Sequence, residues 1–269
     1  MSRNAEDKGN GPPVDRRGDC GPFDIIGDVH GCVVELRRLL EVLGYRVDPL
    51  PAGAGLAGAR HPDGRRVVFV GDLTDRGPRN VDVLRTAMGM TAEGTALGVR
   101  GNHDDKLERY LRGNPVKLEH GLQKTVDELE RTDPDFRAAV AAHIAGMAAH
   151  LWLDGGALLV AHAGLKGEMH GEVSGRARRF AMYGETTGEV DAQGLPVRID
   201  WARDYRGAPL VVYGHTPMLA PRRLNRTVCI DTGCVFGGAL TALRWPEDEL
   251  VSVPASEVHA VSRRWPPPE

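Results

Sequence analysis

Short apolar runs recur along the chain, and each ends in Gly or Ala close to a side chain that can bind metal. Runs of four or five β-branched and apolar residues of this kind predict buried strands. The runs, each written with the residues that follow it, are FDIIGDVHG (23–31), RVVFVGDLTDRG (66–77), ALGVRGNHD (96–104), ALLVAHAG (157–164), LVVYGHTP (210–217) and TVCIDTG (227–233). We therefore expect buried strands here, with chemically active side chains at their carboxyl ends.

Helical spacing appears between several of these predicted strands. Apolar residues at 33, 36, 39, 40 and 43 follow the period of an amphipathic helix, and Gly44 is suited to end it. Val81, Leu84 and Met88 indicate a second amphipathic helix. Strands that alternate with helices predict an α/β fold. In such sheets the functional side chains gather at the carboxyl ends of the strands, so we expect a single site there.

Other segments depart from this alternation. Residues 105–150 read as a helical insert beside the site, and residues 166–206 form a long excursion suited to a lid or substrate wall. Residues 1–21 are rich in Gly, Pro and charge, which predicts a disordered tail. The predicted domain therefore spans residues 22–255, followed by a C-terminal tail at 256–269.

Composition narrows the function classes. The 269 residues suit one α/β domain, and the net charge of −3 argues against a broad basic surface for duplex nucleic acid. The four cysteines form no C-x-x-C pair, which favours reduced thiols. The polar N-terminus has no apolar signal segment, and no long apolar run follows it. We therefore expect a cytoplasmic protein that does not span a membrane.

The residues at the predicted strand ends form a metal-ligand set without thiolates. Carboxylate, imidazole and amide ligands suit Mn²⁺, Fe or Zn²⁺ rather than a soft metal. The set is too large for one catalytic ion with an open position, but it suits two ions that share a carboxylate, for which Asp72 is the candidate. We expect two divalent ions, with Mn²⁺ first and Fe, Ni²⁺ or Zn²⁺ as alternatives. The ligands are Asp28, His30, Asp72, Asn102, His162 and His215.

The segment GDLTDRG and the residue after Asn102 add groups for catalysis. Arg76 can bind phosphate oxygens through its planar guanidinium group. His103 is a candidate general acid for a leaving oxygen, and Asp75 can orient its ring and keep it protonated. These residues predict hydrolysis of a phosphate ester or anhydride.

The motifs GDVHG, GDLTDRG, GNHD, HAG and GH, in this order, resemble those of the calcineurin-like metallophosphoesterases, in the branch of the Ser/Thr phosphoprotein phosphatases. The segments YGETTGE, GLPVRIDWA and IDTGCVFGG resemble two bacterial groups. One is the stand-alone diadenosine tetraphosphatase/protein-phosphatase-like enzymes, and the other is the phosphatase domain of polynucleotide kinase–phosphatases. The third motif ends in Asp104, where phosphoprotein phosphatases usually have Glu, and the phosphate-binding loop of the kinase is absent from the sequence.

The resemblance implies a fold and a role for each matching residue. The expected fold is a four-layer sandwich, with two central mixed β-sheets packed face to face and helices outside. Asp28 and His30 would bind the first metal, Asp72 would bridge, and the remaining ligands would bind the second. The other implied roles are general acid for His103, its partner for Asp75, phosphate binding for Arg76, a further catalytic acid for Asp231, and substrate binding for Tyr183, Glu185 and Thr186.

Three functions remain open from the sequence. The first is hydrolysis of a nucleotide ester or anhydride of the diadenosine tetraphosphate type, by a metal-bridging hydroxide with His103 as general acid. The second is 2′,3′-cyclic phosphodiesterase or 3′-phosphatase activity on nucleotides or RNA 3′ ends. The third is protein Ser/Thr phosphatase activity, which requires a more open cleft than the long segments at 105–150 and 166–206 suggest. The oligomeric state is not determined by the sequence.

Overall fold

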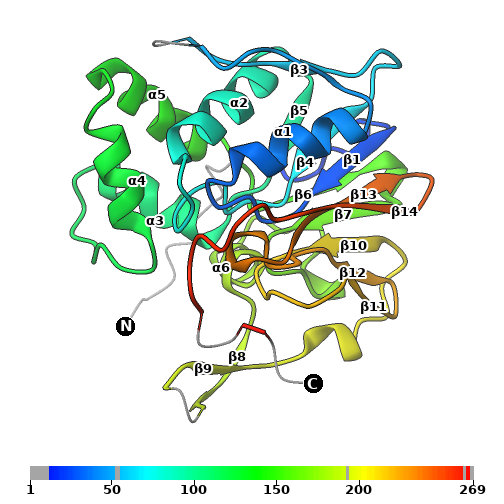
Figure 1. Ribbon diagram of the computed structural model, residues 1–269. Coiled ribbons are helices and arrows are strands. Elements are labelled where there is room, and N and C mark those ends of the chain that lie inside the picture. The colour runs from blue at the N-terminus through cyan, green and yellow to red at the C-terminus, as the bar shows by residue number, and fades with distance from the viewer. Residues whose placement is uncertain (1–11, 52–54, 192–193, 263–264, 267–269) are drawn as a thin grey trace, which may run out of the picture.

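The computed structural model describes residues 12–51, 55–191, 194–262 and 265–266. Its centre is a pair of mixed sheets of five strands each (Figure 1). The first sheet has the order β14 (Glu249–Pro254), β13 (Ala239–Trp245), β1 (Phe23–Ile26), β4 (Arg66–Phe69) and β5 (Ala96–Gly98). The second has the order β11 (Arg222–Leu224), β12 (Thr227–Cys229), β10 (Leu210–Tyr213), β7 (Leu158–Ala161) and β6 (His150–Leu153). The strands predicted from the apolar runs are all present.

Besides these sheets, the described residues form α-helices, two short hairpins and several 3₁₀ turns. The helices are α1 (Val33–Val42), α2 (Asn80–Ala92), α3 (Asn102–Leu111), α4 (Leu122–Leu129), α5 (Pro134–Ala145) and α6 (Gly175–Tyr183). The hairpins are β2 (Arg46–Val47) with β3 (Ala59–Arg60), and β8 (Thr186–Val190) with β9 (Pro196–Arg198). Among the described residues no helix is long and apolar enough to cross a membrane.

Three apolar clusters hold these layers together. The first lies between the sheets, where residues such as Ile25 and Val68 meet Val160 and Val212. The second packs α1 to α5 against the outer face of the first sheet, and the third packs α6 against the outer face of the second. The order helix, sheet, sheet, helix confirms the predicted four-layer α/β sandwich.

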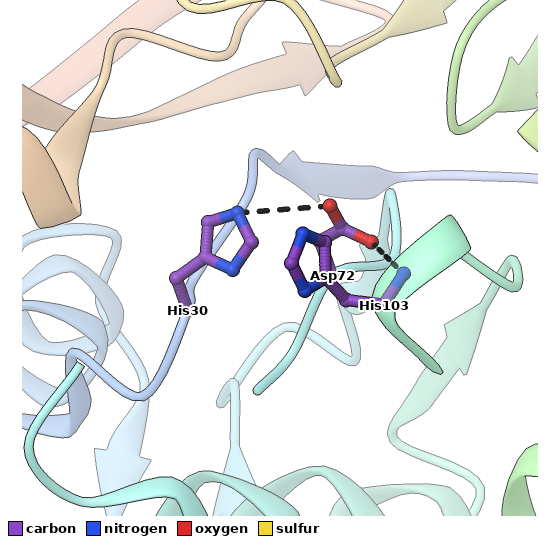
Figure 2. Close-up of side chains that lie close together, drawn as sticks. All are labelled: His30, Asp72 and His103. Carbon is purple, nitrogen blue, oxygen red and sulfur yellow. Dashed lines mark hydrogen bonds and ion pairs between the residues drawn. The ribbon is translucent and has the colours of Figure 1, made fainter. Parts of the chain in front are cut away.

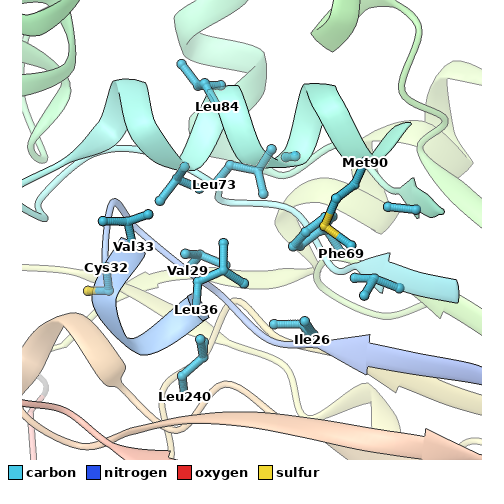
Figure 3. Close-up of a cluster of buried hydrophobic side chains, with 14 of the residues drawn as sticks. Ile26, Val29, Cys32, Val33, Leu36, Phe69, Leu73, Leu84, Met90 and Leu240 are labelled. Carbon is cyan, nitrogen blue, oxygen red and sulfur yellow. The ribbon is translucent and has the colours of Figure 1, made fainter. Parts of the chain in front are cut away.

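Helix α1 buries the apolar stripe that its spacing predicts (Figure 3). Val33, Leu36 and Leu40 are each at most 1% exposed and lie in the same cluster as Phe69 and Leu84. Each such side chain stabilises the fold by about 1.5–3 kcal/mol. This packing fixes the loop before α1, which carries two of the predicted metal ligands.

Strand direction brings the predicted site residues together. Strands β1, β4 and β5 run parallel in the first sheet, and β7, β10 and β12 run parallel in the second. Their carboxyl ends therefore lie at one end of each sheet, and the motif loops that follow them converge there. The Nδ1 atom of His162, after β7, lies 3.0 Å from the carbonyl oxygen of Val70, after β4, which joins the loops of the two sheets.

The prediction of a disordered tail up to residue 21 is wrong from residue 12 onward. Strand β6 is at the edge of its sheet, and Val14 and Arg16 form backbone hydrogen bonds of 2.9 Å with Trp152. Val14 is 5% exposed, and the guanidinium of Arg17 lies 4.5 Å from the centre of the Trp152 ring. Pairing satisfies backbone groups that an edge strand otherwise leaves open. The rest of the predicted tail, 1–11, lies outside the described residues.

The two long segments differ in structure. The predicted helical insert at 105–150 contains most of α3, then α4 and α5, although residues 112–121 form no helix and β6 begins at its end. The excursion at 166–206 contains α6, the hairpin of β8 and β9, and a short 3₁₀ turn at Trp201–Arg203. In the predicted C-terminal tail, backbone N–H groups of His259 and Ala260 donate to the Val235 carbonyl.

Candidate metal centre

Asp72 lies at the centre of the site. It follows β4 in a left-handed conformation, with φ of 48°, and it is 2% exposed. Its Oδ2 lies 3.6 Å from Nε2 of His30 and 3.3 Å from Nε2 of His162. Its Oδ1 accepts a 2.9 Å hydrogen bond from the backbone N–H of His103 (Figure 2). One carboxylate oxygen therefore faces imidazole groups from both sheets, as a bridging ligand requires.

His162 directs a lone pair into the site. Its Nδ1 lies 3.0 Å from the Val70 carbonyl oxygen, which fixes the donor on that nitrogen and leaves Nε2 as an acceptor. Nε2 is 3.0 Å from both Asn102 Oδ1 and His215 Nδ1. Burial opposes protonation, but the carboxylate of Asp72 outweighs it and raises the pKa of His162 to about 9, so a cation bound at Nε2 would replace a proton there. Lone pairs that converge in this way fit a bound cation.

His30 is oriented in the same manner. Its Nδ1 lies 2.8 Å from the Thr74 carbonyl oxygen, so its Nε2 points toward Asp72. The guanidinium of Arg76 contacts this Nε2, and burial together with the Arg76 charge holds the pKa of His30 well below its usual value. His30 is therefore neutral and available as a ligand.

Buried carboxylates add negative charge to the same site. Asp28 and Asp231 are 4% and 6% exposed. Burial raises the pKa of Asp28 well above its usual value, and the charge of Asp231 raises it further. Burial also raises the pKa of Asp231 to about 6. Divalent ions would neutralise this charge, so the oxygen and imidazole donors fit a divalent metal ion.

Close backbone packing makes glycine necessary beside two of these carboxylates. A Cβ atom on Gly214 would lie 1.9 Å from Oδ1 of Asp28, and one on Gly101 would lie 2.2 Å from Oδ1 of Asp72. Atoms cannot approach this closely, so any side chain at either position would displace a predicted ligand. The glycines at these two positions of the motifs are therefore required for steric reasons.

His103, Asp75 and Arg76 lie together beside Asp72. Nδ1 of His103 lies 2.6 Å from Oδ2 of Asp75, and its Nε2 lies 2.8 Å from Nη2 of Arg76. The hydroxyl of Thr125 donates to Oδ1 of Asp75 at 2.5 Å, so α4 of the helical insert holds this carboxylate in place. The structure therefore brings the three predicted catalytic side chains into one hydrogen-bonded group.

Asp104 has a larger role than its sequence position suggests. Its carboxylate accepts backbone hydrogen bonds from Asp72 at 2.9 Å, Leu73 at 3.1 Å and Gly101 at 2.9 Å. The last of these caps the start of α3, and the others join α3 to the loop after β4. The sequence pattern did not indicate the contact between Asp104 and the loop after β4, or the hydrogen bond from Thr125 to Asp75.

Of the predicted substrate-binding residues, Arg76 lies among the ligands, and two of the others line a cavity beside them. Tyr183 and Glu185 line a cavity of about 240 Å³ that also borders His215. The hydroxyl of Tyr183 donates to Asp105 at 3.3 Å, and Glu185 pairs with Lys166 at 2.5 Å. Thr186 is exposed in β8 and is not among the residues that line this cavity.

Comparison with known families identifies the arrangement. The sequence profile of the calcineurin-like phosphoesterases matches residues 21–233, which is most of the chain. The chain belongs to the calcineurin-like phosphoesterase family. The predicted fold class and the assignment as a phosphoester hydrolase are thereby confirmed. Members of this family act with divalent metals, which agrees with the donor set described above.

Named relatives cover nearly the full chain. Bis(5′-nucleosyl)-tetraphosphatase PrpE (asymmetrical) of Bacillus subtilis is 46% identical over 246 residues, covering 90% of this chain and 98% of that protein. The enzyme of the same name from Anoxybacillus flavithermus is 45% identical over 239 residues, covering 87% and 94%.

Solved structures share the calcineurin-like fold. A crystal structure assigned provisionally as a diadenosine tetraphosphatase has a TM-score of 0.64 and 24% identity, covering 91% of this chain and 98% of that one. A protein serine/threonine phosphatase from Saccharomyces cerevisiae has a TM-score of 0.58 and 14% identity, covering 92% and 85%. At these identities the likeness concerns the fold alone.

Proposed function

We propose that this protein hydrolyses bis(5′-nucleosyl) tetraphosphates at a site for two divalent metals. The proposal rests on the position of Asp72. Its Oδ2 lies 3.6 Å from Nε2 of His30 and 3.3 Å from Nε2 of His162. The substrate class follows from relatives named as bis(5′-nucleosyl)-tetraphosphatases, which are 45–46% identical over most of this chain.

The metal ligands divide into two groups around this carboxylate. Asp28 and His30 would hold one ion, and Asn102, His162 and His215 would hold the other. Mn²⁺ is the expected ion, and Fe, Ni²⁺ or Zn²⁺ would fit the same donors. When bound, such a pair lowers the pKa of water and offsets negative charge on a phosphoryl group.

The chain supplies the proton for the leaving group. Asp75 accepts from Nδ1 of His103 at 2.6 Å, which fixes the orientation of the ring. Nε2 then faces the site and donates its proton to the leaving phosphate oxygen as the P–O bond breaks, while the oxygen of water bonds to phosphorus.

Arg76 and Asp231 have supporting roles in this scheme. Arg76, next to Nε2 of both His30 and His103, donates to the non-bridging phosphate oxygens. Asp231 borders Asp28 and adds a buried carboxylate that can accept a proton, in keeping with its raised pKa of about 6.

A second candidate activity is opening of 2′,3′-cyclic phosphates, because the IDTG segment around Asp231 resembles the phosphatase domain of RNA-repair enzymes. The two activities differ in substrate and not in the metal-ligand set. A competition between substrates therefore separates them.

The experiment gives the Mn²⁺-loaded protein diadenosine tetraphosphate and 2′,3′-cyclic AMP at equal concentration, with products followed by chromatography. The proposal expects the tetraphosphate to be consumed first and His103→Ala to consume neither at a comparable rate. Faster opening of the cyclic phosphate would replace the proposal with the second activity. Equal turnover by the variant would show that a contaminating enzyme is responsible.

A further inference from the structure

A cavity of about 240 Å³ opens beside the predicted metal ligand His215. One side is formed by the end of β10, through Tyr213 and Thr216, and the other by the excursion at 166–206, through Ile199 and Trp201. Cavities that bind small molecules usually measure about 300–1,000 Å³. This one is therefore large enough for part of a dinucleotide and too small for all of it.

The wall of the cavity offers apolar surface in a fixed position. Trp201 and Tyr213 pack edge to face with ring centres 5.1 Å apart. The indole N–H of Trp201 donates to the Ala163 carbonyl at 3.1 Å, which fixes the ring. Tyr183 and Ile199, which also line the cavity, remain 41% and 38% exposed. Exposed apolar groups of this kind bind the flat face of a nucleobase.

Two arginines border the same cavity, and hydrogen bonds hold both of them. Arg222 forms hydrogen bonds of 3.0 and 2.6 Å with Asp200, so a carboxylate neutralises it. Arg198 donates through Nη1 to the hydroxyl of Thr216 at 2.9 Å. Thr216 directly follows His215 in the chain, and Arg198 and His215 line the same cavity, so Arg198 lies close to this predicted metal ligand. A guanidinium at this point suits a phosphate group.

We infer that the cavity binds one nucleoside of the substrate, and that Arg198 binds the phosphate chain between that nucleoside and the reacting phosphorus. This inference rests on the proposed function. It makes Arg198 a specificity-determining residue that recognises a nucleotide through phosphates other than the one that reacts. The second nucleoside of the substrate would extend toward solvent.

Arg198→Gln tests the inference because it removes the charge from an exposed side chain and preserves most of its length. The measurement is kcat/KM for diadenosine tetraphosphate and for p-nitrophenyl phosphate, whose single phosphate is the reacting one. The inference expects the ratio of these two constants to fall at least tenfold, mainly through KM for the dinucleotide. Arg131→Gln, an exposed arginine between α4 and α5, is the matched control and should leave the ratio unchanged.

The outcomes distinguish this inference from the proposed function. An unchanged ratio in Arg198→Gln, or an equal loss on both substrates, would overturn the role of Arg198 while the tetraphosphatase assignment stands. Hydrolysis of p-nitrophenyl phosphate by the wild-type protein without any hydrolysis of the tetraphosphate would instead overturn the proposed function, and the inference with it.

Discussion

At the scale of single residues, the site depends on histidines in which one ring nitrogen is held by a hydrogen bond outside the site. His103 uses Nδ1 for Asp75 and His162 uses Nδ1 for the Val70 carbonyl, so each presents only Nε2 to the site. Fixing the ring in this way determines which nitrogen reacts. The proposed division of labour between acid and metal ligand follows from these partners.

Replacing His103 by Ala should reveal whether it protonates the leaving group. General acid catalysis contributes roughly 10²–10⁴-fold, so kcat for diadenosine tetraphosphate should fall by about this factor. Nitrophenolate leaves without a proton, and p-nitrophenyl phosphate should therefore lose much less. Steady-state kinetics with both substrates test this, and equal losses would mean that His103 acts through Asp72 instead.

Asp72→Asn should weaken metal binding at both positions. The bridging role requires a charged oxygen, and an amide retains the shape but removes the charge. Metal analysis after gel filtration should find about two Mn²⁺ per wild-type chain and markedly fewer in the variant. Full occupancy in the variant would argue against a bridge at this residue.

At the scale of elements, a buried carboxylate joins segments that the sequence keeps apart. Asp104, in the first turn of α3, accepts backbone N–H groups from the loop after β4 as well as from its own helix start. The helical insert similarly holds Asp75 through Thr125 in α4. The insert therefore positions Asp75, one of the proposed catalytic groups.

Asp104→Ala should destabilise the protein by roughly 3 kcal/mol or more. It leaves buried N–H groups without an acceptor, and each costs about 1–3 kcal/mol. Asp105→Ala is the control, because Asp105 pairs with Arg100 near the surface and such pairs contribute at most about 1 kcal/mol. Urea unfolding of both variants measures the difference, and similar losses would contradict the role of Asp104.

At the scale of the whole molecule, stability should depend on pH through His150 in β6. This residue is fully buried, and burial lowers its pKa to about 4. The folded state therefore favours neutral His150, while the unfolded chain takes up a proton near pH 6.5. The stabilisation is present above pH 6.5 and is lost as the pH falls from 6.5 toward 4.

Between pH 7 and pH 5 this residue alone should reduce the free energy of unfolding by about 2 kcal/mol. His150→Gln removes the titrating group and keeps an acceptor for the Gly171 N–H that the imidazole binds at 3.2 Å. Denaturant unfolding at both pH values should show that the free energy of unfolding falls less in the variant than in the wild-type protein. An identical loss in the two proteins would assign the acid sensitivity to other groups.

The sequence by itself determined the strands that precede the motifs, the first two helices, the family and the types of side chain at those strand ends. It could do so because burial imposes a local period and parallel strands deliver their carboxyl ends to one place. It misjudged residues 12–21, whose polar composition gave no sign that Val14 and Arg16 pair with the edge strand β6.

Only the tertiary structure decided how those side chains meet. The approach of His30 and His162 to one oxygen of Asp72, and the cavity bordered by Arg198 and His215, join residues from distant segments of the chain. Such contacts depend on how two sheets and their loops pack. The spacing of apolar residues within one strand or helix does not determine that packing. The sequence therefore predicted which types of side chain the site contains, whereas their arrangement in space depends on the tertiary structure.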